Sequence, residues 1–288
     1  MRLCRFRRAD DADARARLGF VHGDQVSEIP EPVATRLAAL IADAEPAARL
    51  ADLAGQAELR RISLGSVTLL PPVDAQEVWA AGVTYERSRQ ARMDESEFSA
   101  SAYDRVYAAE RPEIFFKALP AKVSGPGDPI GVRADSRWTV PEPELALLMN
   151  AAGRVVGCTI GNDVSARDIE GENLLYLPQA KVYRHSCALG PWLVLGATEA
   201  EVRSWNVRMD IVRAGECVFS DATSLSRIRR SFDELAAFLF RSQDLPYGAC
   251  LLTGTGIVPP DDFTLRPGDE VLVEIDGIGC LRNPVVTV

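Results

Sequence analysis

Residues 138–149, with the sequence WTVPEPELALLM, decide how the rest of the chain is interpreted. The last five residues are apolar and predict a buried strand, so Glu142 and Glu144 stand at the mouth of a core. Side chains alternate faces along a strand, so the two carboxylates point to the same side. At partial burial their repulsion is about 2 kcal/mol for an effective dielectric constant of roughly 20. Such a pair predicts a cation or a proton between the two carboxylates.

A third carboxylate is expected beside this pair. A return strand is predicted at 154–160, and a hairpin of this kind brings Asp163 next to Glu142 and Glu144. Oxygen ligands without a nearby His or Cys suit Mg²⁺ or Mn²⁺, and also Ca²⁺, better than Zn²⁺. The alternative is a solvated strand face. Pro143, which stiffens the backbone between the glutamates, and the buried strand after them favour the metal site.

Composition and charge exclude several classes of protein. The 288 residues are 47% hydrophobic and 25% charged, as in an ordinary soluble globular protein with a large core. The net charge of −9 and the lack of a basic stripe argue against a nucleic-acid partner. No apolar run reaches the roughly 18 residues of a membrane helix, and the N-terminus lacks the apolar core of a signal peptide. Six scattered cysteines, most of them in apolar strand-like surroundings, predict buried free thiols in a reducing cytoplasm.

The two histidines limit acid–base and nucleophilic chemistry. His22 precedes an apparent hairpin turn, far from the acidic stretch. His185 lies in the segment 183–187, where nothing resembles a nucleophile elbow. We therefore interpret His185 as a packing or supporting residue rather than a catalytic base.

Turn residues and periodicity predict an α+β, β-rich fold in two domains, 1–72 and 73–288. The first is a small unit of short strands with two helices, at 33–42 and from Pro46 to Gly55. The second consists mainly of strands, with one helix at 232–241 behind the capping box that begins at Ser231.

A polar segment and an aromatic strand follow the predicted strand at 77–83. The segment 86–110 reads as helical, and either a lid or a solvated helix fits its pattern. Residues 114–116 predict a strand with Glu113 and Lys117 at its two ends. Charged residues in such places usually cap or snorkel. They can also hold an acid and a base at the rim of a pocket.

Six segments in order along the chain resemble motifs of the fumarylacetoacetate hydrolase family: Gly82–Tyr85, Arg111–Lys117, Pro141–Leu145, Asn162–Asp168, Lys181 and Thr253–Gly256. The resemblance covers roughly residues 75–288. Three stretches, Arg111–Lys117, Trp138–Glu144 and Leu175–Gln179, look most like the 2-keto-3-deoxy-D-arabinonate dehydratases. The resemblance implies a catalytic domain of the mixed β-roll type behind a small N-terminal domain, and a homodimer or homotetramer.

The resemblance also implies a ligand set and a substrate. Mg²⁺ would be held by Glu142, Glu144 and Asp163, and would bind a 2-keto-3-deoxy sugar acid. Arg167 and Lys181 match positions that face the substrate or its oxyanion.

Further roles are expected for other residues near this site, the first of them from the same resemblance. Thr255 falls in the loop that lines the pocket, and Thr84 and Lys117 are further substrate-binding candidates. Lys181 and Glu113 are the expected base and acid, in an order that the sequence leaves open. A salt bridge to a metal carboxylate is the alternative for Lys181, and capping of the following helix is the alternative for Thr84.

One departure from the family pattern bears on the reaction. The carbon–carbon hydrolases of the family carry a His after the Gly-x-x-Tyr motif, and residues 86–110 contain none. Without an imidazole to activate water, dehydration is favoured. Two alternatives stay open. One is cleavage or decarboxylation of acylpyruvate- or oxaloacetate-type acids, with Glu86, Glu113 or the metal activating water. The other is a non-catalytic relative, which three carboxylates turned apart would favour.

Overall fold

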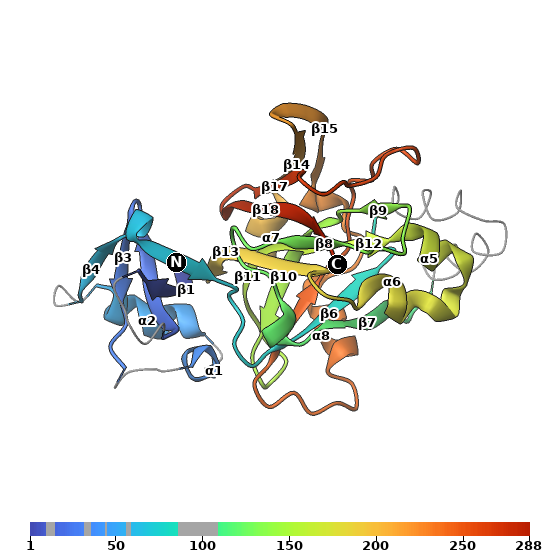
Figure 1. Ribbon diagram of the computed structural model, residues 1–288. Helices are drawn as coiled ribbons and strands as arrows, with labels where there is room; N and C mark the ends of the chain where they lie inside the picture. Colours follow the sequence, from blue (N-terminus) through green and yellow to red (C-terminus); the bar gives the residue numbers. More distant parts are fainter. Residues whose placement is uncertain (10–14, 32–35, 44, 56–58, 86–108) are drawn as a thin grey trace.

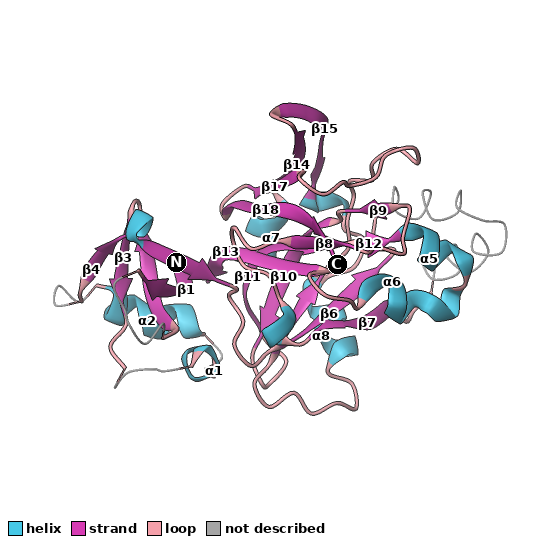
Figure 2. Ribbon diagram, viewed as in Figure 1, coloured by secondary structure: helices cyan, strands magenta, loops and turns pink. Residues whose placement is uncertain are grey.

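The computed structural model describes residues 1–9, 15–31, 36–43, 45–55, 59–85 and 109–288. Two mixed sheets make up most of it (Figures 1 and 2). The larger has eleven strands, in the order β4-β3-β2-β1-β13-β11-β10-β16-β6-β7 with β5 paired to β1, and the smaller has the order β15-β14-β17-β18-β8. The predicted β-rich, mixed architecture is confirmed. Among the described residues, no helix has the length and hydrophobicity to cross a membrane.

The N-terminal elements gather on the left of Figure 1. They are β1 (Arg2–Arg8), β2 (Arg17–His22), β3 (Gln25–Glu28), α1 (Leu37–Leu40), α2 (Pro46–Ala54), β4 (Arg61–Ser63), the 3₁₀ turn η1 (Leu64–Ser66) and β5 (Val67–Leu70). Helix α2 begins and ends as predicted, with Pro46 in its first turn and Gly55 as its C-cap. The helix expected at 33–42 is only one turn long within the described residues. Strand β4 was not predicted.

The remaining strands surround the acidic stretch. They are β6 (Glu77–Gly82), β7 (Glu113–Ala118), β8 (Ile130–Val132), β9 (Thr139–Val140), β10 (Pro143–Met149), β11 (Val155–Asp163), β12 (Ser165–Ala166), β13 (Cys187–Leu195), β14 (Asn206–Arg213), β15 (Glu216–Ser224), β16 (Ala249–Leu252), β17 (Glu270–Ile275) and β18 (Gly279–Thr287). Apart from residues 109 and 110, the segment expected to be a helix or a lid lies outside the described residues.

Short helices and turns connect these strands. They are η2 (Pro120–Lys122), α5 (Arg167–Glu172), η3 (Leu174–Tyr176), α6 (Leu177–Lys181), α7 (Glu199–Arg203), η4 (Leu225–Arg227) and α8 (Phe232–Leu239). Helix α8 confirms the predicted helix, since the Ser231 side chain accepts a hydrogen bond from the Glu234 N–H. Helices α5 and α6 pack together against β12 at one end of the molecule (Figure 2).

The N-terminal strands continue the large sheet. Strand β1 pairs with β13, with Arg2 opposite Val194 and Leu3 opposite Leu193. The chain therefore runs through one sheet on both sides of residue 72, and the division into domains 1–72 and 73–288 remains a proposal.

Strand β10 is buried on both faces. Leu145 and Leu147 belong to the core shared with the five-stranded sheet, and Ala146 and Leu148 to the core on the opposite side. A strand covered on both faces loses the usual alternation of polar and apolar residues. This burial anchors the start of β10, where the two glutamates stand.

The cysteines fall into two groups. Four are buried, Cys4, Cys158, Cys187 and Cys250, and burial raises the pKa of the Cys158 thiol to about 12. Cys217 and Cys280 are exposed, so burial applies to four of the six. All six are free thiols.

Candidate active site

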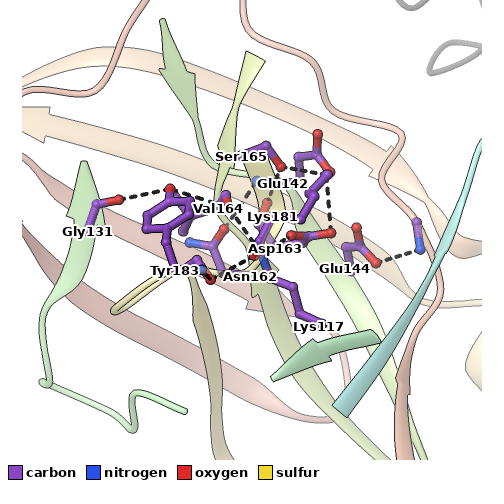
Figure 3. A network of polar contacts seen from close by, with 12 residues as sticks. Lys117, Gly131, Glu142, Glu144, Asn162, Asp163, Val164, Ser165, Lys181 and Tyr183 are labelled. Carbon is purple, nitrogen blue, oxygen red and sulfur yellow. Dashed lines mark hydrogen bonds and ion pairs between the residues drawn. The ribbon is translucent and has the colours of Figure 1, made fainter. Parts of the chain in front are cut away.

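Three buried carboxylates meet where β10 begins and β11 ends (Figure 3). Glu142, Glu144 and Asp163 each offer an oxygen, and these oxygens lie within 4.8 Å of one another. Their residues are at most 4% exposed. The Asp163 N–H donates to the Glu142 carbonyl at 3.0 Å, so the hairpin brings the aspartate back beside the glutamates as predicted.

Electrostatics favour a proton or a cation at this cluster. Burial, followed by the charges of Asp163 and Glu142, raises the pKa of Glu144 well above its ordinary value of 4.5. The cluster contains neither His nor Cys among the described residues. A buried donor set made only of carboxylate oxygens fits a hard divalent ion such as Mg²⁺.

Three cationic side chains surround the carboxylates. The Lys181 Nζ donates to Glu142 Oε2 at 2.7 Å and to Asp163 Oδ2 at 3.2 Å. Arg167 forms an ion pair with Glu142 Oε1 at 2.8 Å, and Lys117 forms one with Asp163 Oδ1. The salt bridge considered as the alternative role of Lys181 is therefore present.

A narrow cavity opens onto the carboxylates. Besides the three carboxylates, four of the predicted site residues line it: Glu113 from β7, Arg167 from α5, Lys181 at the end of α6, and Thr255. Residues 81–83 and Gly254 also line it. The structure thus places two candidates for proton transfer and the proposed metal ligands around one space.

Thr84 and Lys117 do not line this cavity. Thr84 is 1% exposed, and its hydroxyl donates to the Thr253 carbonyl at 2.5 Å. Lys117 is fully buried and donates to the carbonyls of Val164 at 3.1 Å and Lys181 at 2.5 Å. Both side chains therefore bond to protein groups, Lys117 also to the cavity-lining Asp163, and neither lines the cavity as the predicted substrate contact would.

One ionisable residue of the cavity was missed from the sequence. Glu170 is 3% exposed and lines the cavity from α5, three residues after Arg167. Residues three apart share a helix face. That spacing could have indicated Glu170, had a helix been predicted at 167–172.

Residues 77–286 match the family model described as "Fumarylacetoacetate (FAA) hydrolase C-terminal". The chain belongs to the fumarylacetoacetate hydrolase family. The match contains every residue of the site, and it confirms the membership predicted from the motifs.

Two relatives and one solved structure refine the comparison. The Haloferax volcanii protein named "Probable 2-keto-3-deoxyxylonate dehydratase" is 51% identical over 217 residues, 75% of this chain and 74% of that protein. The "2-dehydro-3-deoxy-D-arabinonate dehydratase" of Saccharolobus solfataricus is 41% identical over 233 residues, 80% and 78% of the two chains. A structure of "2-keto-3-deoxy-D-arabinonate dehydratase complexed with magnesium and 2,5-dioxopentanoate" matches with a TM-score of 0.84 at 31% identity, over 100% of this chain and 99% of that chain.

Proposed function

We propose that this protein is a Mg²⁺-dependent hydro-lyase that converts 2-keto-3-deoxy-D-arabinonate to 2,5-dioxopentanoate. The observation that carries the proposal is the buried triad of Glu142, Glu144 and Asp163, which opens into a cavity that also holds Lys181 and Glu113. The names of the two similar relatives and of the magnesium complex supply the substrate class.

The two relatives' names describe closely related substrates. A 2-keto-3-deoxypentonate has a planar carbon at C2 and a CH₂ group at C3, so C4 is its single stereocentre. The substrates named for the two relatives therefore differ at most in configuration at C4. For this protein we propose the D configuration, which the name of the Saccharolobus solfataricus relative carries.

A bound Mg²⁺ supplies Lewis-acid polarisation of the 2-keto group, which makes the C3 protons acidic. Of Glu113 and Lys181, one accepts a C3 proton and the other donates a proton to the C4 hydroxyl, which leaves as water. The resulting 3-enoate shifts a proton from C5 to C3, and its enol becomes the C5 aldehyde. The net change is the loss of one water. Arg167, which lines the cavity, binds the anionic end of the substrate.

Turnover and its metal dependence test the proposal. Purified protein with Mg²⁺ should convert 2-keto-3-deoxy-D-pentonate to 2,5-dioxopentanoate, measured through a coupled aldehyde dehydrogenase. EDTA should abolish the reaction, and added Mg²⁺ should restore it, because the carboxylates alone cannot polarise the ketone. Mn²⁺ and Ca²⁺ in place of Mg²⁺ define the metal preference. Absence of turnover, with acylpyruvates or oxaloacetate consumed instead, would contradict the proposal.

Assembly and location remain predictions. The family resemblance predicts a homodimer or homotetramer, and the cysteine pattern predicts the cytoplasm. Light scattering coupled to size-exclusion chromatography measures the first directly.

Gly82 gives a further prediction. It lies opposite Glu113 in the β6–β7 pair, and a Cβ on Gly82 would lie 2.1 Å from Glu113 Oε2. Gly82→Ala should therefore displace this carboxylate and lower kcat about 100-fold, since a misplacement of roughly 1 Å is enough for such a loss. Steady-state kinetics across a Mg²⁺ titration should show an unchanged Mg²⁺ requirement.

The matched control is Gly65→Ala, whose Cβ would meet nothing closer than 3.8 Å. It should leave kcat unchanged. A wild-type kcat in Gly82→Ala would mean that catalysis does not depend on the position of the Glu113 carboxylate beside Gly82.

A further inference from the structure

We propose that Thr84 is a positioning residue of the metal centre, which acts through a single peptide group to orient Glu144. The inference rests on the proposed metal site but requires no substrate. It gives Thr84 a role different from the substrate contact predicted from the sequence.

The contacts form one continuous chain. The Thr84 hydroxyl donates to the Thr253 carbonyl at 2.5 Å, and the Gly254 N–H donates to Glu144 Oε2 at 2.5 Å. The Thr253 carbonyl and the Gly254 N–H belong to the same peptide group. Because a peptide is planar, fixing its carbonyl also fixes the direction of its N–H. Thr84 therefore determines where the donor to Glu144 points.

Thr253, which carries the carbonyl of this peptide, is itself anchored to β10. The Thr253 N–H and hydroxyl donate to the Leu145 carbonyl, at 3.0 and 2.9 Å. Leu145 directly follows Glu144 in β10, so this anchor ties the loop to the strand that carries the carboxylate. The bonds to Leu145 hold Thr253 in place, and the Thr84 hydroxyl bonds to the carbonyl of the peptide that follows.

Packing supports the same role. Gly254 has φ of +87°, and a Cβ there would lie 2.1 Å from the Thr84 hydroxyl oxygen. Thr84 is therefore in direct contact with this glycine and buried to 1% exposure. The position suits a hydroxyl that supports the loop from behind the cavity.

The expected consequence is a change in metal affinity. Groups that hydrogen-bond to metal ligands fix ligand orientation, and their loss typically weakens metal binding about 10- to 100-fold. In this chain the ligand's partner is a backbone N–H, which substitution cannot remove. Substitution of Thr84 is the way to free the orientation of that N–H, because the Thr84 hydroxyl bonds to the carbonyl of the same peptide.

The test measures metal binding without substrate. Mn²⁺ titration, followed by the electron paramagnetic resonance signal of the free ion, gives the Kd of wild type, Thr84→Val and Thr84→Ser. Thr84→Val keeps the shape but lacks the hydroxyl, and its Kd should rise about 10-fold. Thr84→Ser keeps the hydroxyl and should stay within about twofold of wild type.

Thr159→Val is the matched control. Its hydroxyl is also fully buried and donates to a backbone carbonyl, that of Gly190 at 2.9 Å. This substitution removes an equivalent hydrogen bond elsewhere and should leave the Mn²⁺ affinity unchanged. If Thr84→Val fails to fold, Thr84→Ala compared with Thr159→Ala gives the same comparison.

Each other outcome has one meaning. A wild-type Mn²⁺ Kd in Thr84→Val, with only the KM for the keto acid raised, would overturn the inference and assign Thr84 to substrate binding. A wild-type protein that binds no Mn²⁺ would overturn both the inference and the metal site. If Thr84→Val weakens Mn²⁺ binding as expected but the wild-type protein turns over no keto acid, the inference is supported and only the proposed dehydratase activity is refuted.

Discussion

Replacing Glu144 with glutamine should lower Mg²⁺-dependent turnover by about 1,000-fold. The amide still accepts the hydrogen bond from the Gly254 N–H, so the loop keeps its anchor, but one of three anionic ligands is lost. Metal polarisation of the ketone contributes several kcal/mol to the transition state, and about 1.4 kcal/mol corresponds to tenfold in rate. The coupled assay at saturating Mg²⁺ measures the loss.

The same substitution should stabilise the metal-free protein at neutral pH. Because burial and two carboxylates raise the pKa of Glu144, the folded state binds its proton more tightly than the unfolded state. The stability from this proton is fully present below about pH 4.5 and is lost as the pH rises through the folded-state pKa. Glutamine does not ionise, so the variant avoids the loss.

Thermal unfolding in EDTA and in Mg²⁺ tests both effects together. At pH 8 in EDTA, Glu144→Gln should have the higher Tm, and the difference should shrink toward pH 4.5. In Mg²⁺ the order should reverse, because a ligand that binds only the folded state stabilises wild type. Glu216→Gln, at an exposed position, should follow wild type throughout. A Mg²⁺-induced rise in Tm that persists in Glu144→Gln would argue against Glu144 as a ligand.

The acidic hairpin could be predicted because its signals are local. An apolar run, a turn and a second strand fix the register, and the register places Asp163 beside Glu142. The short helices α5 and α6 escaped prediction for the opposite reason. Helices of five or six residues are not stable by propensity and form through tertiary packing. Glu170 was missed with them.

Long-range contacts also explain why the partners of the buried polar residues could not be predicted. Thr84 bonds to a carbonyl 169 positions away, and Lys117 to the carbonyls of Val164 and Lys181. The motifs marked these residues as close to the site. Only the folded chain shows that the Thr84 hydroxyl is directed to a backbone carbonyl, and that Lys117 contacts two backbone carbonyls and the Asp163 carboxylate. The pairing of β1 with β13 likewise has no local signal.

Exchange of the C3 protons with solvent should identify Glu113 as the base. The Lys181 ammonium has three hydrogens and three acceptors: Glu142 Oε2, Asp163 Oδ2 and the Ser165 hydroxyl oxygen at 2.5 Å. The Ser165 hydroxyl donates to the Asp163 carbonyl, so its oxygen is an acceptor for the lysine. An ammonium whose three hydrogens are all donated in hydrogen bonds has no lone pair to accept a proton, so it is a poor base and a suitable acid. Proton abstraction is therefore left to Glu113.

Glu113→Gln should therefore lose both turnover and C3 exchange in D₂O, followed by proton NMR with Mg²⁺ and the keto acid. Lys181→Arg keeps the charge but holds its proton, so turnover should fall about 100- to 10,000-fold while C3 exchange continues. Lys122→Arg, at an exposed position, controls for the substitution itself. The reverse pattern, with exchange lost in Lys181→Arg and retained in Glu113→Gln, would assign the base to Lys181. It would also require the lysine's hydrogen bonds to the carboxylates to be broken when metal and substrate bind.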